Sequence, residues 1–363
     1  MAIDAKIRNI IEAEGHIKLD KFIQEAMSIN SDSYYVKTQE IGNNGDFITS
    51  PELSQLFGEM LALWIIEQWQ NLGSPTEFCL CELGPGKGSL MNDILRTIDK
   101  ISNITTSKIN IFLFDINPWL IKKQKELLQR YNQKITWIKK LNELPNIPTI
   151  IISNEFFDAL PIKQYTMIKD KWYEVTLIVD PIDGQIKFDK VEINQALANY
   201  LALEHINASD GAVFEESIES LCIFRTICGH ISRNSGAIIT IDYGYNIDPK
   251  IRTRAQYNPT LQAVKDHKYW PIISSIGEAD LSSHVDFFAL LKTANESGLT
   301  DINFLTQRDF LCKYGIITRY NELTKFAVLE EQSILNNQLH RLIDEDKMGL
   351  LFKVLEVKSF TEK

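Results

Sequence analysis

The segment from Cys79 to Ser89, CLCELGPGKGS, constrains this chain more than any other. A short apolar run ends in Glu82, and glycines follow at the alternate positions 84, 86 and 88. Glycine lets a chain bend sharply and lets a ligand approach the backbone closely. The pattern therefore predicts a buried strand, a tight turn and a helix from Ser89 to Ile98. A plain glycine-rich turn without a ligand is the alternative interpretation.

The spacing of these glycines indicates which ligand the turn can bind. It is G-x-G-x-G, which differs from the G-x-G-x-x-G of dinucleotide-binding proteins. An acidic residue two positions before the first glycine suits a ligand with an ammonium group, such as the methionine part of S-adenosylmethionine (SAM). The spacing and Glu82 therefore argue against a nicotinamide dehydrogenase.

Apolar runs around this segment predict the fold class. Runs at 77–82, 110–115, 135–138 and 149–153 alternate with helical patterns, which predicts an α/β fold with a parallel, doubly wound sheet. Such sheets bind ligands at the carboxyl ends of their strands. A hairpin at 171–180 and 185–191, with Asp183-Gly184 in the turn, leads into a mostly helical stretch to about Asn234. AIITIDYGY and LFKVLEV then return to the sheet.

The N-terminal part is predicted to be helical. One helix ends near Gly15, a second spans Leu19 to Ile29, and a third follows a polar loop, with Ser50 as its N-cap and Pro51 at its first position. The first helix contains acidic residues and lacks an apolar run of signal-peptide or membrane length. We therefore expect no membrane insertion and a cytoplasmic location.

Charge and cysteine content limit the partners. The net charge of −10 argues against a general nucleic-acid binder, which needs a basic face to release counterions from phosphates. It is compatible with a basic protein substrate. The five cysteines lack metal-ligand spacing, so we expect no metal site and a reducing compartment.

Asp115 ends the second predicted strand. An acidic residue at this place accepts hydrogen bonds from the ribose hydroxyls of a bound nucleoside, in SAM or in NAD. The alternative role is the N-cap of a helix from Pro118 onward.

The segment NEFFDALP follows the strand at 149–153 and carries two carboxylates, Glu155 and Asp158, beside two aromatic residues. Paired acids can orient a cationic nitrogen nucleophile and accept its proton, and aromatic rings stabilise the cation and exclude water. A guanidinium is a poor nucleophile because its charge is delocalised, so a carboxylate that holds it would suit an arginine substrate. The alternative is a helix cap with core aromatics.

Two further segments are candidates for the site. The loop GDFITSPE can fold over the cofactor, with Phe47 packing on the ligand and Thr49 or Ser50 bonding to it, or it can be a plain helix entry. TLQAV and GEADLSSHVDF contain His284 and Asp286, which are too few for a metal site. We expect a structural or substrate-loop role for them.

Seven segments, in order, resemble the MidA-like family of class I SAM-dependent methyltransferases. They are GDFITSPELSQLFGE, CELGPGKGSLMNDILR, IISNEFFDALPIKQ, IDYGY, TLQAV, GEADLSSHVDF and MGLLFKVL, and the resemblance extends from about Ile7 to Val357. The family includes the mitochondrial protein-arginine methyltransferase that assists the assembly of respiratory complex I.

The resemblance implies a Rossmann-like, seven-stranded class I methyltransferase sheet with helical and β-hairpin insertions and an N-terminal helical extension. The expected parts are 1–75 (helical extension and lid loop), 76–165 (first half of the SAM-binding core), 166–235 (hairpin and helical insertion) and 236–363 (second half of the core, with a substrate-loop insertion). A homodimer is one expectation for the oligomeric state.

The resemblance also implies the site residues. SAM would be bound by Glu82, Gly84, Pro85, Gly86, Gly88 and Asp115, together with Phe47, Thr49 and Ser50. The adenine contact stays open, because 139–142 is more basic than expected near an adenine. Glu155 is the expected catalytic carboxylate, with Asp158 as its helper. Candidates on the substrate side are Asn154, Phe156, Phe157, His284 and Asp286.

The function that follows is a SAM-dependent protein-arginine methyltransferase that acts on a subunit of complex I. Two alternatives stay open. One is an assembly chaperone that binds SAM without turnover, and the other is a methyltransferase for another protein or a small molecule.

Overall fold

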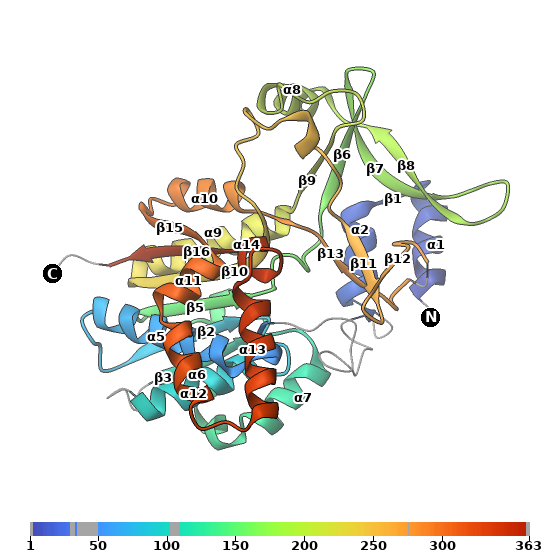
Figure 1. Ribbon diagram of the computed structural model, residues 1–363. Coiled ribbons are helices and arrows are strands. Elements are labelled where there is room, and N and C mark those ends of the chain that lie inside the picture. Colours follow the sequence, from blue (N-terminus) through green and yellow to red (C-terminus); the bar gives the residue numbers. More distant parts are fainter. Residues whose placement is uncertain (1–2, 30–32, 35–49, 102–108, 275, 361–363) are drawn as a thin grey trace. The chain divides into compact units, whose positions relative to one another are not determined.

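A computed structural model describes residues 3–29, 33–34, 50–101, 109–274 and 276–360 (Figure 1). The chain divides into two compact units. The core unit comprises Ile41–Phe156, Ile223–Gly244 and Ala289–Lys363, and the second unit comprises Met1–Glu40, Phe157–Cys222 and Tyr245–Phe288. Each unit is thus assembled from three separate segments. The four-part division expected from the sequence stays a prediction.

The core unit is built on one sheet. Along its path, seven strands of the described chain lie in the order β4-β3-β2-β5-β10-β16-β15. Neighbours from β4 to β10 are parallel, and β16 is antiparallel to both β10 and β15. The strands are β2 (Phe78–Leu83), β3 (Ile109–Phe114), β4 (Ile135–Ile138), β5 (Thr149–Asn154), β10 (Gly236–Tyr245), β15 (Asp301–Thr306) and β16 (Phe352–Ser359). The expected seven strands are present in the described chain, and the short strand β14 (Val285–Asp286) pairs with β10 as an eighth strand of the sheet.

The central strands are the ones that the sequence predicted within a residue or two. Every residue of β2 and β5 is buried, as strands covered on both faces must be, and such strands read as continuous apolar runs. The strand β15 was not predicted. It lies at the end of the sheet's strand order, and each of its residues is exposed or only partly buried.

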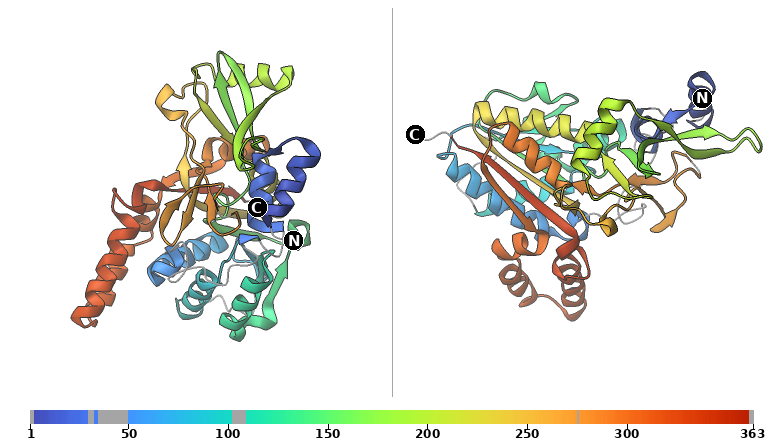
Figure 2. Two further views of the ribbon diagram at one scale, coloured as in Figure 1. Left: turned by 90° about the vertical axis from the view of Figure 1, so that its right-hand side faces the viewer. Right: turned by 90° about the horizontal axis from the view of Figure 1, so that it is seen from above.

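Helices cover this sheet, and the α12–α13 pair projects away from it (Figure 2). The buried face of α6 carries Leu90, Met91, Ile94, Leu95 and Ile98, and α5 is buried on more than one face, as predicted. The helices are α4 (Ser50–Leu53), α5 (Gln55–Asn71), α6 (Ser89–Ile101), α7 (Pro118–Leu127), α9 (Ile218–Asn234), α10 (Phe287–Glu296), α11 (Gln307–Lys313), α12 (Ile316–Thr324), α13 (Leu329–Ile343) and α14 (Met348–Leu351), with 3-10 turns η3 (Gln129–Lys134) and η4 (Leu141–Glu143).

The predicted start of the long helix is wrong. The N-cap of α5 is Ser54, whose side chain accepts a hydrogen bond from Leu56 N, and Ser50 begins the separate short helix α4. Ser54, four residues later, was not predicted as a cap. The extended backbone of Ser54 (φ −158°, ψ 135°) separates α4 from α5, because a helix ends where a residue leaves the helical region.

The second unit contains two smaller sheets. The larger has the order β1-β7-β6-β9 with β8 beside β7, and the smaller has the order β12-β11-β13. The predicted hairpin is confirmed as β7 and β8, but β6 and β9 were not predicted. The elements are α1 (Ile3–Glu14), β1 (Ile17–Lys18), α2 (Leu19–Gln24), a π-helix η1 (Glu25–Ile29), β6 (Lys163–Ile168), β7 (Lys171–Val179), β8 (Ile186–Glu192), α8 (Gln195–Glu204), β9 (Val213–Glu216), η5 (Arg254–Gln256), β11 (Gln262–Lys265), β12 (Lys268–Trp270), β13 (Asp280–Ser282) and β14 (Val285–Asp286).

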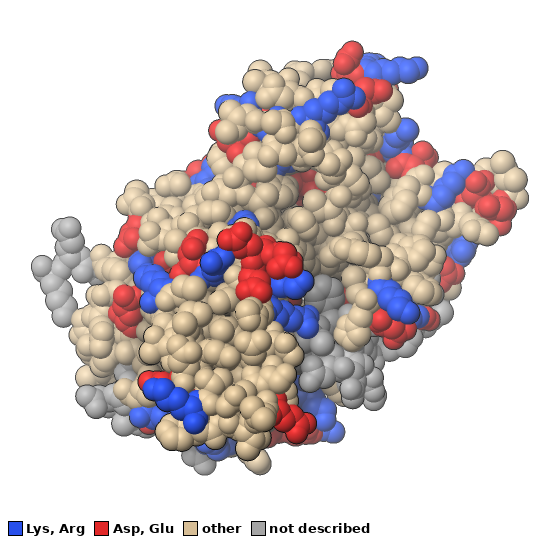
Figure 3. Space-filling model, viewed as in Figure 1, with Lys and Arg blue, Asp and Glu red and all other residues tan. Residues whose placement is uncertain are grey.

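The surface bears on the expected partners. On the face shown in Figure 3, acidic and basic side chains of the described residues are interspersed, and the basic ones form no continuous stripe. Within the described ranges, no helix has the length and apolar character needed to cross a membrane.

Candidate functional site

The order of the core sheet marks one place for a ligand. From β2 the chain proceeds outward to β3 and β4, whereas β5 and β10 lie on the other side of β2. The carboxyl ends of β2 and β5 therefore border the point where the strand order reverses, and ligands of open α/β sheets bind there. Glu82 is the last residue but one of β2 and lies next to the glycine turn, and Glu155 directly follows β5.

The glycine turn has the backbone that only glycine adopts easily. Gly84, Gly86 and Gly88 have φ values of +63°, +54° and +88°. Gly84 N donates to Phe114 O at 3.0 Å, and Gly88 N donates to Pro85 O at 2.8 Å. The turn is thus bonded both to the neighbouring strand and to itself, and α6 begins directly after it.

Two of these glycines differ in what surrounds them. A Cβ at Gly84 would lie 2.7 Å from Cδ2 of Phe156, so a side chain there would collide with this ring. A Cβ at Gly86 would meet no atom of the described chain within 4 Å. Phe156 therefore packs on the start of the turn, whereas Gly86 faces open space in which a ligand can lie against the backbone.

Glu82 is a buried carboxylate that lacks a complete set of partners. Its residue is 3% exposed, and its Oε2 has no hydrogen-bond partner among the described residues. Burial, and next the charge of Asp115, raise the pKa of Glu82 to about 8. Burying a polar atom without a partner is costly, so this oxygen points to a missing hydrogen-bond donor. The ammonium or a hydroxyl of SAM fits that requirement.

Asp115 follows β3 and is 9% exposed. Its Oδ1 accepts from Asn117 N at 2.8 Å, and its Oδ2 accepts from Gln124 Nε2 at 2.7 Å. Burial raises the pKa of Asp115, and these two hydrogen bonds oppose the rise. Because a carboxylate oxygen can accept more than one hydrogen bond, the Asp115 carboxylate can still accept from ribose hydroxyls.

The helix-cap alternative for Asp115 is wrong. The N-cap of α7 is Asn117, whose Oδ1 accepts from Trp119 N at 2.9 Å and from Leu120 N at 3.2 Å. Asp115 and Asn117 both precede Pro118 in the sequence. Asn117 forms the cap because it directly precedes the first residue of the helix.

Glu155 lies directly after β5 in an uncommon conformation. Its φ is +50°, and its N donates to Ile241 O of β10 at 3.0 Å. Its Oε1 accepts from Ser50 N at 3.2 Å and from Asn154 Nδ2 at 3.2 Å. A left-handed backbone costs a non-glycine residue on the order of 1–3 kcal/mol, and such residues cluster at active sites. The strand end thus holds a partly exposed carboxylate beside the switch point.

Ser50 lies in the core unit and is buried. Its hydroxyl donates to Met348 Sδ at 3.9 Å, while its N–H holds Glu155. The structure therefore places Ser50 against the expected catalytic carboxylate. Phe47 and Thr49, the other two residues expected from this loop, lie outside the described residues.

The aromatic pair of NEFFDALP divides between the two units. Phe156 belongs to the core unit, and its ring contacts that of Phe114 edge-on with centroids 6.1 Å apart. Phe157 and Asp158 belong to the second unit. Phe157 is 2% exposed, and the backbone O of Asp158 accepts from Ser283 N at 3.0 Å.

The remaining candidates lie in the second unit. TLQAV and GEADLSSHVDF contribute paired strands, β11 and β13, and His284 N donates to Thr260 Oγ1 at 2.8 Å. Nη2 of the buried Arg252 lies 3.7 Å from Asp286 Oδ2. These contacts suit the structural role that the sequence favoured. Among the described residues, no group of three or more His, Cys, Asp or Glu is arranged to hold a metal ion.

Three residues that were not predicted from the sequence form hydrogen bonds to the predicted segments. Glu215 of β9 accepts hydrogen bonds from Thr260 N and Leu261 N, at 3.0 and 3.1 Å, and so holds TLQAV. In the core unit, Trp137 and Gln124 bond to each other beside Asp115. None of the three stands in a motif, so only their contacts show what they do.

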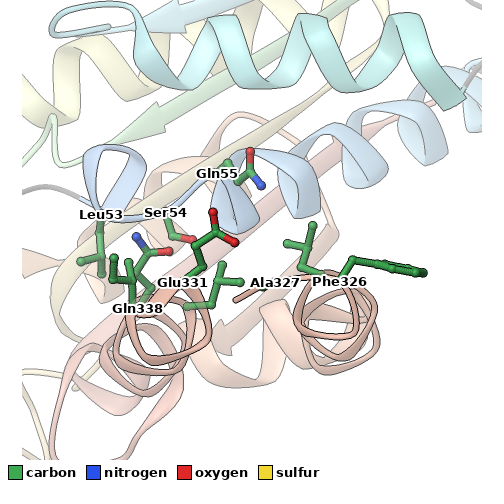
Figure 4. A pocket seen from close by; sticks show the side chains of 10 residues that line it. Leu53, Ser54, Gln55, Phe326, Ala327, Glu331 and Gln338 are labelled. Atoms are coloured by element: carbon green, nitrogen blue, oxygen red, sulfur yellow. The ribbon is translucent and has the colours of Figure 1, made fainter. Parts of the chain in front are cut away.

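A hollow of about 550 Å³ lies elsewhere in the core unit (Figure 4). It is lined by the junction of α4 with α5 and by the α12–α13 pair, and it contains none of the predicted site residues. Phe326, at its border, is 92% exposed.

The chain is similar in sequence to known methyltransferases. The family model described as "Putative S-adenosyl-L-methionine-dependent methyltransferase" matches residues 60–305. The protein arginine methyltransferase NDUFAF7, mitochondrial, of Danio rerio is 31% identical over 96% of this chain and 84% of its own length. Its human counterpart is 29% identical over 78% of this chain and 67% of its own length.

A similar solved structure shows the same fold. The crystal structure of a protein from Burkholderia thailandensis, described as a likely methyl transferase and bound to S-adenosylhomocysteine, aligns with a TM-score of 0.86 at 24% identity. The alignment covers 99% of this chain and 92% of that one.

These relatives correct one expectation and establish the class. The predicted cytoplasmic location is wrong, because the relatives of the chain from zebrafish, fly and human are mitochondrial proteins. The glycine turn, the unpartnered oxygen of Glu82 and the acceptor at Asp115 fit SAM as the cofactor. With a family model over most of its length and a relative at 31% identity, the chain belongs to the family of SAM-dependent methyltransferases.

Proposed function

We propose that this methyltransferase modifies an arginine side chain of a protein, and that the protein is a subunit of respiratory complex I. The relatives named protein arginine methyltransferase support the arginine, and the family resemblance supports complex I. The observation that carries the proposal is the Glu155 carboxylate, held by Ser50 and Asn154 at the carboxyl end of β5.

The chemistry of an arginine acceptor requires such a carboxylate. A guanidinium stays protonated and delocalised at neutral pH, so its nitrogen needs to be oriented and its proton removed. Glu155 supplies an acceptor for the guanidinium N–H groups. Asp158 is the proposed helper, and Asn154 and Phe156 are the proposed neighbours on the substrate side.

The bound cofactor supplies an electrophilic methyl group on a sulfonium. The arginine nitrogen forms the new N–C bond, the C–S bond breaks with its electrons going to sulfur, and the nitrogen's proton passes to a carboxylate oxygen of Glu155. The enzyme contributes alignment, exclusion of water and the proton acceptor, and alignment alone can lower a barrier by several kcal/mol. The proposed cofactor contacts are Glu82, Gly84, Pro85, Gly86, Gly88 and Asp115, with Phe47, Thr49 and Ser50 from the loop.

The test uses the purified chain, SAM with a labelled methyl group, and purified complex I subunits offered one at a time. We expect label on one subunit, at a residue that mass spectrometry identifies as methylarginine. The matched control is Glu155→Gln, which keeps the shape of the side chain but should leave the subunit unlabelled.

Other outcomes separate the alternatives. Binding of SAM without label on any subunit would favour an assembly factor that does not turn over. Label on a lysine, or on a small molecule in a cell extract, would replace the arginine proposal with a different acceptor.

A further inference from the structure

Gln124 is a buried residue of α7 whose side chain is fully bonded within the core unit. It is 0% exposed. Its Oε1 accepts from Trp137 Nε1 at 2.8 Å, and its Nε2 donates to Gly86 O at 2.8 Å and to Asp115 Oδ2 at 2.7 Å. One amide therefore connects the glycine turn after β2 with the acidic residue after β3.

The orientation of this amide follows from its partners. The indole N–H of Trp137 can only donate, so the atom that faces it must be the amide oxygen. Both N–H groups of Gln124 are then directed at acceptors, the carbonyl of Gly86 and the carboxylate of Asp115. A residue without a two-donor amide cannot make both contacts while satisfying Trp137.

Packing around the turn indicates the same connection. A Cβ at Gly88 would lie 3.5 Å from Gln124 Cγ and 3.6 Å from Gln124 Cα. These are van der Waals distances, so α7 lies directly against the turn at Gln124. The hydrogen bond from Gln124 also opposes the rise in the pKa of Asp115 that burial causes, so it favours the ionised acceptor.

We propose that Gln124 is a positioning residue for SAM: it holds the Asp115 carboxylate and the Gly86 backbone at a fixed separation, so that one nucleoside can contact both. Gln124 acts through Asp115 and Gly86 and does not itself touch the cofactor. The inference rests on the assignment of Asp115 and Gly86 to the SAM site.

Calorimetric titration of the full chain with S-adenosylhomocysteine, and with its analogue lacking both ribose hydroxyls, tests this role. Gln124→Met keeps the length of the side chain but removes its hydrogen bonds. Its affinity for S-adenosylhomocysteine should fall at least about tenfold, the scale of a hydrogen bond to a charged group. The affinity for the analogue should fall only about threefold, because the analogue has no ribose hydroxyls that could donate to Asp115. Lys122→Ala, exposed on the same helix, is the control and should change neither affinity.

Trp137→Phe is the second variant. It keeps Gln124 but removes the donor that orients the amide, and it too should weaken S-adenosylhomocysteine more than the analogue. Equal losses for both ligands in both variants would overturn the proposal, since they would show a general disturbance of the pocket. Unchanged affinity in Gln124→Met would overturn it as well.

A third variant separates failure of the inference from failure of the site assignment. If Asp115→Ala weakens S-adenosylhomocysteine while Gln124→Met does not, the site is right and the role of Gln124 is wrong. If Asp115→Ala binds as tightly as the unchanged protein, the assignment of Asp115 fails, and the inference fails with it.

Discussion

Acidic residues lie at the carboxyl ends of β2, β3 and β5 in the core sheet, and they differ in how far they are buried. Glu82, near the end of β2, and Asp115, after β3, are almost completely buried, and burial is the main cause that raises the pKa of each. Glu155, after β5, is partly exposed, and its Oε1 is held by Ser50 N and Asn154 Nδ2.

The difference teaches how one sheet edge can serve two ligands. Buried carboxylates suit a small cofactor that displaces water and supplies the missing donors itself. A partly exposed carboxylate, kept in place by neutral donors, suits the side chain of a second, larger molecule that arrives and leaves. Under this comparison, changes near β2 and β3 should affect cofactor binding, and changes at Glu155 should affect the reaction.

The largest expected effect is at the glycine turn. Gly86→Val should abolish the rise in melting temperature that S-adenosylhomocysteine causes, because the branched side chain would fill the open space above the turn and resist φ of +54°. Gly184→Val is the matched control: its φ is +69° and its Cβ would also meet no atom within 4 Å, but it lies in the β7–β8 turn. A folded Gly86→Val protein that still responds to the ligand would remove the turn from the site.

The next effect separates reaction from binding. Glu155→Gln should lower the rate of methyl transfer by at least about a hundredfold, the scale of a lost general base, with little change in SAM affinity. Asp158→Asn should be milder. Single-turnover rates and titrations on the same preparations measure both quantities. Near-normal turnover in Glu155→Gln would refute the carboxylate assignment.

Asp115→Ala should weaken SAM binding by about 1.5–3 kcal/mol, the contribution of hydrogen bonds to a charged group. The rate at saturating SAM should change little, because Asp115 lies on the cofactor side of the comparison. Glu126→Ala, on the exposed face of α7, is the control for titration. A loss confined to the rate would contradict the division between the two regions.

The smallest expected effect is a dependence of stability on pH. Glu82 has a pKa of about 8 in the folded protein against its ordinary 4.5, so the folded state binds more protons between these values. The contribution of Glu82 to stability is then fully present below about pH 4.5 and is lost as the pH rises through about 8. Urea unfolding of the ligand-free protein at pH 5 and pH 8.5 should show a smaller difference in Glu82→Gln. Identical differences in the two proteins would mean that Glu82 is not strained by its burial.

Regular features of the fold could be predicted from the sequence because they depend on local pattern. Apolar runs identified β2, β3, β4 and β5, and in β2 and β5 every residue is apolar or buried because both faces of the strand are covered. Asp183-Gly184 identified the hairpin turn, because the positive φ at Gly184 favours glycine. The edge strand β15 and the strands β6 and β9 carry no such pattern. Their pairing depends on neighbours far away in the chain.

The candidate site divides in the same way. The sequence by itself determined the glycine turn, Glu82, Asp115 and the acidic segment after β5, because each lies at or just after the end of a strand that its own residues specify. Only the tertiary structure decided that Glu155 is held by the N–H of Ser50 and that Gln124 joins Gly86 to Asp115. The reason is physical: a hydrogen bond between residues distant in sequence has no periodicity, and its partners are chosen by packing once the strands have set the distance between them.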